Sequence, residues 1–151
     1  MSRCESTICV MRQTRLPGVE RLPLRVSHNL FFALWPGDAV RDQIETAARQ
    51  LKRANEPRGR LIKRHRYHLT LQYLGEHPIL PENLVTAACA AGNEVRGPGF
   101  DFALDTAGSF ANRKIPWWLG CSRVSDGLAA LCDEIIAGLR KSGSKVDDDA
   151  L

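Results

Sequence analysis

The sequence predicts a fold of the α/β or α+β class, in which strands and helices interleave along the chain. Some segments alternate apolar and polar residues, as strands do, and others repeat apolar residues at helical spacing. The 151 residues are the size of one domain, and 44% are hydrophobic and 25% charged, as in ordinary globular proteins. This composition excludes wholesale disorder, collagen-like repeats and a coiled coil.

Four segments are predicted to be strands. The first, His28–Trp35, is a short apolar run rich in aromatic residues, which is typical of a buried strand. The second, Tyr67–Leu74, alternates apolar and polar residues and is expected to end at Gly75. The other two are Phe100–Leu104 and Trp117–Cys121.

Three segments are predicted to be helices. The first begins at Asp38, after a Pro-Gly break, and ends near Ala54. The second is the alanine-rich stretch Pro81–Val95. The third has Ser125 as its N-cap, an apolar stripe of six residues, and Gly143 at its C-terminal end.

The ends of the chain and its cysteines suggest a reduced, cytoplasmic protein. Residues 1–27 carry a net charge of +3 without any sustained period, and we expect a poorly ordered basic extension before a domain over residues 28–151. No apolar run reaches the ~20 residues of a membrane span, and no secretory signal is visible. The five cysteines are an odd number without CxxC spacing, so neither a disulfide framework nor a zinc site is expected.

Positive charge is concentrated between Arg49 and Arg66. This segment holds eight basic residues against Glu56 alone, whereas the whole chain has a net charge of only +4. Such a cluster attracts phosphate groups, and equally it forms the solvated end of a helix and its loop. The chain contains neither GxGxxG nor GxxxxGK[ST], which excludes the common dinucleotide and P-loop sites.

The pair His68-x-Thr70 is the main candidate for chemistry. In a strand these two side chains lie on the same face, ~7 Å apart at ~3.3 Å per residue. An imidazole exchanges protons near neutral pH and a hydroxyl donates to a phosphoryl oxygen, so the pair suits a phosphate group. A chance surface strand gives the same pattern. Strict alternation assigns Gln72 to this face, and Tyr67, Leu69, Leu71 and Tyr73 to the core face.

From Leu30 onward the sequence resembles the two-histidine (2H) phosphoesterases, in the branch of 2′-5′ RNA ligase-like proteins and RNA 2′,3′-cyclic phosphodiesterases. The resemblance rests on LFFALWP at Leu30–Pro36, HLTLQYLGE at His68–Glu76, and WWLG at Trp117–Gly120. It implies a bilobal α+β fold with two small antiparallel sheets flanked by helices. It also implies hydrolysis of a terminal 2′,3′-cyclic phosphate on RNA to a 2′-phosphate, without metal or cofactor, and in some members 2′-5′ ligation of tRNA halves.

The resemblance also assigns roles to residues. His68 matches the histidine that donates a proton to the leaving 3′ oxygen, and Thr70 matches the threonine that binds phosphate. For further contacts with RNA the candidates are Trp118, Arg113, His65 and Arg66. Each has an ordinary alternative: Trp118 packs in the core, and the others are solvated side chains. We expect a monomer that acts on RNA ends and does not bind a membrane.

The family pattern requires a second His-x-Thr, and the four histidines include only one that precedes a threonine by two positions. Comparing the two halves of the chain places the second motif near position 156, after Leu151. We therefore expect a second lobe that is incomplete at the C-terminus and a chain that is weakly active or inactive. The alternatives are a noncatalytic RNA-binding remnant and a gene fragment without function.

Overall fold

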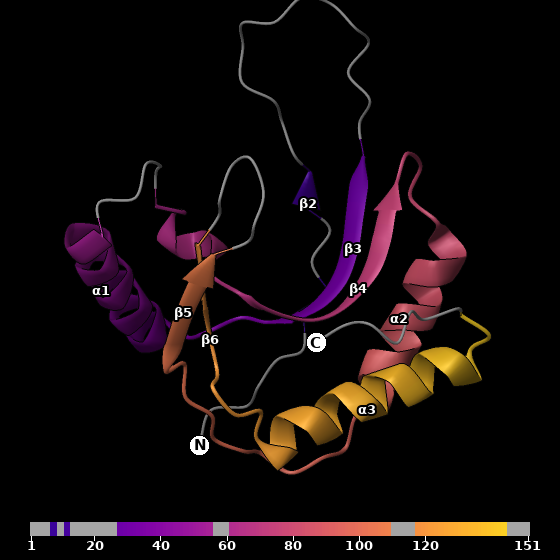
Figure 1. The fold of residues 1–151 in the computed structure, drawn as a ribbon. Coiled ribbons are helices and arrows are strands. Elements are labelled where there is room, and N and C mark those ends of the chain that lie inside the picture. Colours follow the sequence, from indigo (N-terminus) through magenta and orange to yellow (C-terminus); the bar gives the residue numbers. More distant parts are fainter. Residues whose placement is uncertain (1–6, 9–10, 13–26, 56–60, 110–116, 145–151) are drawn as a thin grey trace, which may run out of the picture. The chain divides into compact units, whose positions relative to one another are not determined.

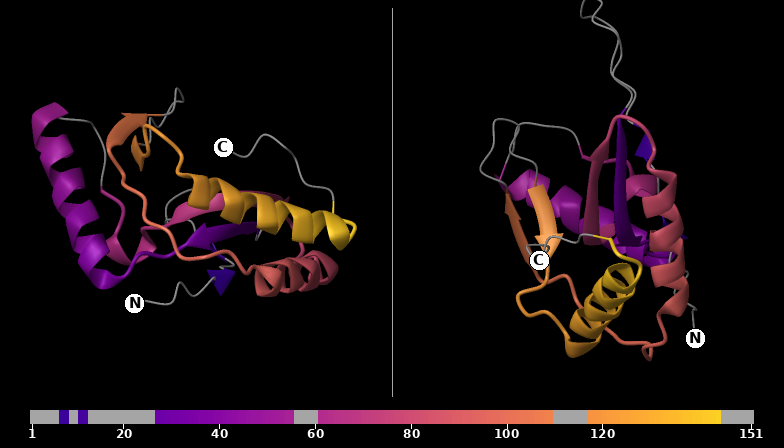
Figure 2. Two further views of the ribbon diagram at one scale, coloured as in Figure 1. Left: turned by 90° about the horizontal axis from the view of Figure 1, so that it is seen from below. Right: turned by 90° about the vertical axis from the view of Figure 1, so that its right-hand side faces the viewer.

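The computed structural model describes residues 7–8, 11–12, 27–55, 61–109 and 117–144. The chain divides into two compact units, one within residues 1–81 and one within residues 82–148. Each unit contains one antiparallel sheet and at least one helix (Figures 1 and 2). Helices and strands therefore make an α+β fold with two small sheets, as predicted. None of the described helices is long and apolar enough to cross a membrane.

The first unit is built around strand β3 (His28–Leu34), which pairs with β4 (Leu69–His77) in antiparallel orientation. Two short strands, β1 (Thr7–Ile8) and β2 (Met11–Arg12), also pair with β3. The rest of the basic N-terminal extension expected over residues 1–27 lies outside the described residues, apart from Ser27. Five consecutive residues of β3, from Leu30 to Leu34, are buried, so the aromatic run is a core strand as predicted.

Among its described residues, the first unit also contains a long helix and one 3-10 turn. Helix α1 (Asp38–Asn55) begins at the predicted residue, and η1 (Arg64–Arg66) ends shortly before β4, with Tyr67 and His68 between them. Strand β4 starts two residues later than predicted, because the Tyr67 N–H donates to the carbonyl of Arg64 and so belongs to the turn. His68 therefore lies at the junction between a turn and a strand.

Strand β4 contains two bulges that alter its alternation. Leu30 pairs with Gly75 but Phe31 pairs with Tyr73, so one residue of β4 has no partner between them. A second extra residue, Leu71, follows Thr70 in the same way. A bulge of this kind moves every later side chain to the opposite face.

The bulges overturn the predicted faces of β4. Tyr73, expected in the core, is 49% exposed, whereas Gln72, expected beside His68 and Thr70, is 1% exposed. The strand also continues through Gly75 rather than ending there. Gly75 has a φ of 108°, which a residue with a Cβ rarely adopts, and this lets the strand pass the bulge with its pairing intact.

The second unit contains two helices and a hairpin. Helix α2 (Glu82–Glu94) packs against α3 (Asp126–Lys141), and β5 (Thr106–Ser109) pairs with β6 (Trp117–Gly120). Ser125 caps α3 by accepting a hydrogen bond from the Leu128 N–H at 3.3 Å, as predicted. Gly143 follows the C-terminal end of α3 and has a φ of 74°, also as predicted. The buried apolar residues of this unit are Ala88, Ala91, Leu128, Cys132, Ile135 and Leu139.

The prediction of a strand at Phe100–Leu104 is wrong. These residues are irregular, and the partner of β6 is the next segment, Thr106–Ser109. The aromatic side chains of the irregular segment pack instead of pairing: the Phe100 ring lies where a Cβ on Gly127 of α3 would be, and it contacts the Phe102 ring at 6.1 Å.

We expect the pair Asp105 and Ser122 to stabilise the hairpin only above acid pH. The Asp105 carboxylate accepts hydrogen bonds from the Ser122 hydroxyl at 2.5 Å and the Ser122 N–H at 2.6 Å, and both lower the pKa of Asp105. A lowered pKa in the folded state stabilises the fold above the unfolded pKa of ~3.9, and this is lost as the pH falls through the folded value. Ser122→Ala should therefore lower the melting temperature at pH 7 and have little effect at pH 2. An equal difference at both pH values contradicts this.

Candidate functional site

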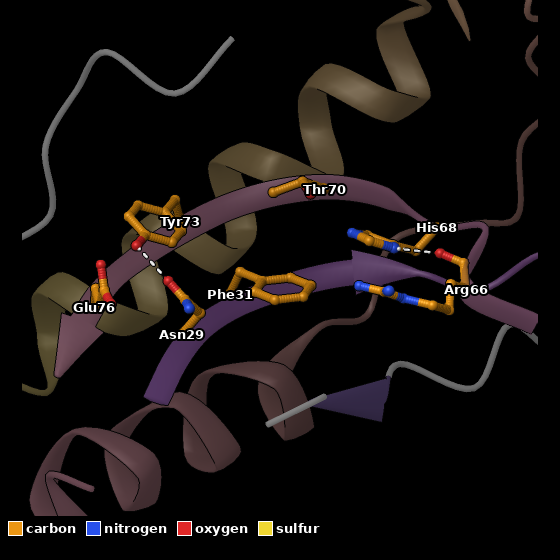
Figure 3. A pocket seen from close by; sticks show the side chains of 7 residues that line it. All are labelled: Asn29, Phe31, Arg66, His68, Thr70, Tyr73 and Glu76. Atoms are coloured by element: carbon orange, nitrogen blue, oxygen red, sulfur yellow. Dashed lines mark hydrogen bonds between the residues drawn. The ribbon is translucent and has the colours of Figure 1, made fainter. Parts of the chain in front are cut away.

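A pocket of about 390 Å³ lies on one face of β3 and β4, within the first unit (Figure 3). It is lined by Asn29, Phe31, Arg66, His68, Thr70, Tyr73 and Glu76. Three of these seven side chains belong to residues that were singled out from the sequence. The pocket therefore combines the predicted His-x-Thr pair with side chains that the sequence did not indicate.

His68 is held by one hydrogen bond and two aromatic contacts. Its Nδ1 lies 2.8 Å from the carbonyl oxygen of Arg66. Because a carbonyl only accepts, Nδ1 carries the hydrogen, and Nε2 is the nitrogen that can gain or lose a proton. The imidazole also stacks on Phe31, with ring centroids 5.2 Å apart, and contacts Trp35 at 5.4 Å. These contacts fix the ring plane, and Figure 3 shows the ring lining the pocket.

Thr70 lies beside His68 on the same face, as the sequence predicts. It is exposed and pairs with Ala33 of β3, one residue before the first bulge. Its hydroxyl can donate one hydrogen bond to an anion in the pocket. Arg66, at the end of η1, adds a guanidinium group to the same part of the pocket.

The turn that supplies Arg66 is fixed to the start of α1 by Arg64. The Arg64 guanidinium contacts the Asp42 carboxylate at 2.7 Å, the Asp38 carboxylate at 3.1 Å and the Asp38 carbonyl at 2.9 Å. The hydrogen bond with Asp42 raises the pKa of Arg64 further above its already high value. Because the Arg66 carbonyl belongs to this turn, the anchoring by Arg64 also positions the acceptor that orients His68.

The other end of the pocket was missed by sequence reasoning. Here the Tyr73 hydroxyl donates to the Asn29 side-chain oxygen at 2.9 Å, and Glu76 lies opposite Asn29 in the strand register. Without the bulges, strict alternation from His68 and Thr70 would reach positions 72, 74 and 76, but the pocket is lined by residues 73 and 76. In the sequence of β4, the glycine at position 75 was the only residue that indicated an irregular strand.

His65 and Trp118, two of the remaining predicted contacts, are not among the residues that line this pocket. His65 is exposed on η1 and does not line it. Trp118 belongs to β6 of the second unit, where its ring lies over Gly108 and Gly120 and is 41% exposed. Trp118 is therefore a surface residue of the hairpin, which contradicts the alternative that it packs in the core. Arg113 lies outside the described residues.

The basic segment between Arg49 and Arg66 is described except for residues 56–60. Two of its arginines form ion pairs with α1: Arg49 with Glu45 at 2.6 Å, and Arg64 as above. Two arginines of the basic segment are thus paired with acidic side chains of the first unit, whereas Arg66 lines the pocket. Among the described residues there is no group of three His, Cys, Asp or Glu side chains that would hold a metal ion.

The fold and the His-x-Thr pocket define a phosphoesterase of the two-histidine class, and comparison with known proteins supports this. Residues 34–118 match the family described as LigT like Phosphoesterase, and the chain belongs to this family. No match was found among curated proteins.

Two solved structures of E. coli LigT resemble the chain in sequence and fold. The structure of LigT complexed with 3′-AMP is 30% identical, with a TM-score of 0.57, and the match covers 80% of this chain and 68% of LigT. The apo structure is 31% identical, with a TM-score of 0.59, covering 79% and 66%. The chain thus spans about two thirds of LigT.

Proposed function

We propose that the chain is an RNA 2′,3′-cyclic phosphodiesterase, which opens a terminal 2′,3′-cyclic phosphate to a 2′-phosphate and has 2′-5′ ligation as a second reaction. The observation that carries this proposal is the arrangement of His68. Its Nδ1 is hydrogen-bonded to the Arg66 carbonyl, so that Nε2 is the nitrogen available for proton transfer. The pocket around it also contains Thr70 and the Arg66 guanidinium.

In the proposed reaction, water attacks phosphorus and the P–O3′ bond breaks. Nε2 of protonated His68 donates its proton to the leaving 3′ oxygen, which becomes a hydroxyl. The Thr70 hydroxyl and the Arg66 guanidinium stabilise the negative charge that develops on the phosphoryl oxygens. A lone acid of this kind contributes ~10²–10⁴-fold to the rate.

The attacking water must also lose a proton to a base. The resemblance assigns this step to the histidine of a second His-x-Thr, and the 151 residues contain one such pair only. We therefore propose that these residues by themselves turn over slowly, with solvent taking the second proton. The same proposal makes the protein a cytoplasmic monomer that acts on RNA ends such as tRNA halves.

Further contacts with RNA are proposed for residues outside the phosphate pocket. His65 and Arg113 are proposed to contact the phosphate backbone, because both have basic neighbours in the sequence. Trp118 offers a ring that is 41% exposed, and an exposed indole stacks well on a nucleic-acid base.

The proposal is tested by turnover of nucleoside 2′,3′-cyclic phosphates in a chelator, at high protein concentration and long incubation. We expect slow release of the 2′-phosphate and none of the 3′-phosphate, because His68 protonates the 3′ oxygen. A chain extended by a family-like second His-x-Thr strand should be much faster. Release of the 3′-phosphate, or no turnover by either chain, contradicts the proposal. RNA binding without turnover by either chain favours a noncatalytic RNA-binding protein.

A further inference from the structure

The pocket has two ends of opposite chemical character. Arg66, His68 and Thr70 form one end, which suits an anion (Figure 3). Glu76 lies at the other end, beyond Tyr73 and Asn29, and its carboxylate would repel a phosphate. A ligand that fits both ends therefore carries a phosphate at one side and hydrogen-bond donors at the other.

A nucleotide with a cyclic phosphate meets this requirement only through its base. This step rests on the proposed function. In a terminal 2′,3′-cyclic phosphate both ribose hydroxyls are esterified, so neither can donate a hydrogen bond. The carboxylate of Glu76 is an acceptor only. The donors that it can bind in the terminal nucleoside are then the N–H groups of the base.

Tyr73 and Asn29 fix which groups this end of the pocket presents. The Tyr73 hydroxyl donates to the Asn29 side-chain oxygen at 2.9 Å, which directs the two hydrogens of the Asn29 amide to other acceptors. Asn29 and Glu76 are direct partners in the strand register, so their Cβ atoms lie ~4.5–5.5 Å apart. The pocket end thus offers an amide donor beside a carboxylate with two acceptor oxygens. The Tyr73 ring, 49% exposed, lies beside Asn29, and the Phe31 ring lies between this end of the pocket and the phosphate end.

We propose that this end of the pocket reads the Watson–Crick edge of the terminal base and prefers guanine. Guanine has two neighbouring donors, N1–H and the N2 amine, which match the two oxygens of Glu76. Its O6 accepts from the Asn29 amide, and its ring stacks on Tyr73. Adenine and cytosine present an amine beside an unprotonated ring nitrogen that repels a carboxylate, and uracil presents one N–H between two carbonyls. None of these three satisfies both oxygens of Glu76.

The inference is tested by calorimetric binding of the 2′-monophosphates of guanosine, inosine, adenosine and uridine to the whole chain. We expect guanosine to bind about tenfold more tightly than adenosine or uridine, which is the order of discrimination that a bidentate contact gives. Inosine, which lacks the N2 amine, should lie between them. Glu76→Gln should remove the preference for guanosine, because the amide can no longer accept from both donors of guanine and no longer repels the ring nitrogen of adenine. The matched control Glu82→Gln, outside the pocket, should keep the full preference.

Equal affinities for all four nucleotides, or a guanosine preference that survives in Glu76→Gln, overturn the inference. Turnover of the corresponding 2′,3′-cyclic phosphates separates this result from failure of the proposed function. If all four cyclic phosphates are opened at one rate, the function stands and the base-reading end is wrong. If none is opened even by the extended chain and no nucleotide binds, the function and the inference both fall.

Discussion

Replacing His68 by alanine is expected to lower the turnover of a 2′,3′-cyclic phosphate by ~10²–10⁴-fold, the contribution typical of a general acid. The structure gives the reason at the level of single atoms. Nδ1 is hydrogen-bonded to the Arg66 carbonyl at 2.8 Å, so Nε2 alone can protonate the leaving oxygen. Alanine removes this nitrogen but keeps the Thr70 hydroxyl and the Arg66 guanidinium in the chain. Binding of a nucleoside 2′-phosphate should therefore weaken much less than turnover.

His68→Asn makes this test sharper. An asparagine amide can still donate to the Arg66 carbonyl and keep the turn in place, but it has no group that transfers a proton. We expect the rate to fall as far as in His68→Ala while the melting temperature stays near that of the parent chain. Rates would be measured from the time course of 2′-phosphate release, in parallel with calorimetric binding of the product. A substantial rate in His68→Asn contradicts the assignment of His68 as the acid.

The largest loss of stability is expected from Gly138→Val. Gly138 lies in α3 where it meets α2, and a Cβ there would be 2.9 Å from the Ala91 Cβ and 3.0 Å from its Cα. The Cα is backbone and cannot rotate away, so the two helices must separate. Overpacking of this kind typically costs ~1–3 kcal/mol, and the lost contacts of neighbouring Leu139, which is 0% exposed, add to it.

Ala137→Val is the matched control for this substitution. It introduces the same β-branched side chain one position earlier in α3, on an exposed face, so it changes helix propensity without crowding α2. Urea unfolding should show a free-energy loss of ~0.5 kcal/mol or less for Ala137→Val. Equal losses in the two variants contradict the close contact between the helices.

The elements that could be predicted from the sequence are those with local signals. Helix α3 has a serine that caps its first turn and a glycine of positive φ after its last, and both are visible as residue types. The segment Phe100–Leu104 shows where local signals fail. Its alternation resembles a strand, but a strand also needs a partner, and the hydrogen bonds of β6 go to Thr106–Ser109 instead.

The candidate site could be predicted as far as the first bulge. His68 and Thr70 come before the extra residue Leu71, so their common face follows from simple alternation. Tyr73 and Glu76 come after it, and no property of a leucine indicates that it will be left without a partner. The bulge depends on pairing with β3, which is a long-range contact. For this reason the phosphate end of the pocket was found from sequence, and the opposite end appears only in the structure.

The bulge at Leu71 also determines how β4 would respond to a change in its length. Leu71 has no partner in β3, whereas Thr70 pairs with Ala33 and Gln72 with the neighbouring residue Phe32. A deletion of Leu71 would therefore leave Gln72 buried and Tyr73 on the pocket face, and would remove only the local bend that a bulge introduces. The length of β4 at this point can thus vary by one residue in evolution without a change in the side chains that line the pocket.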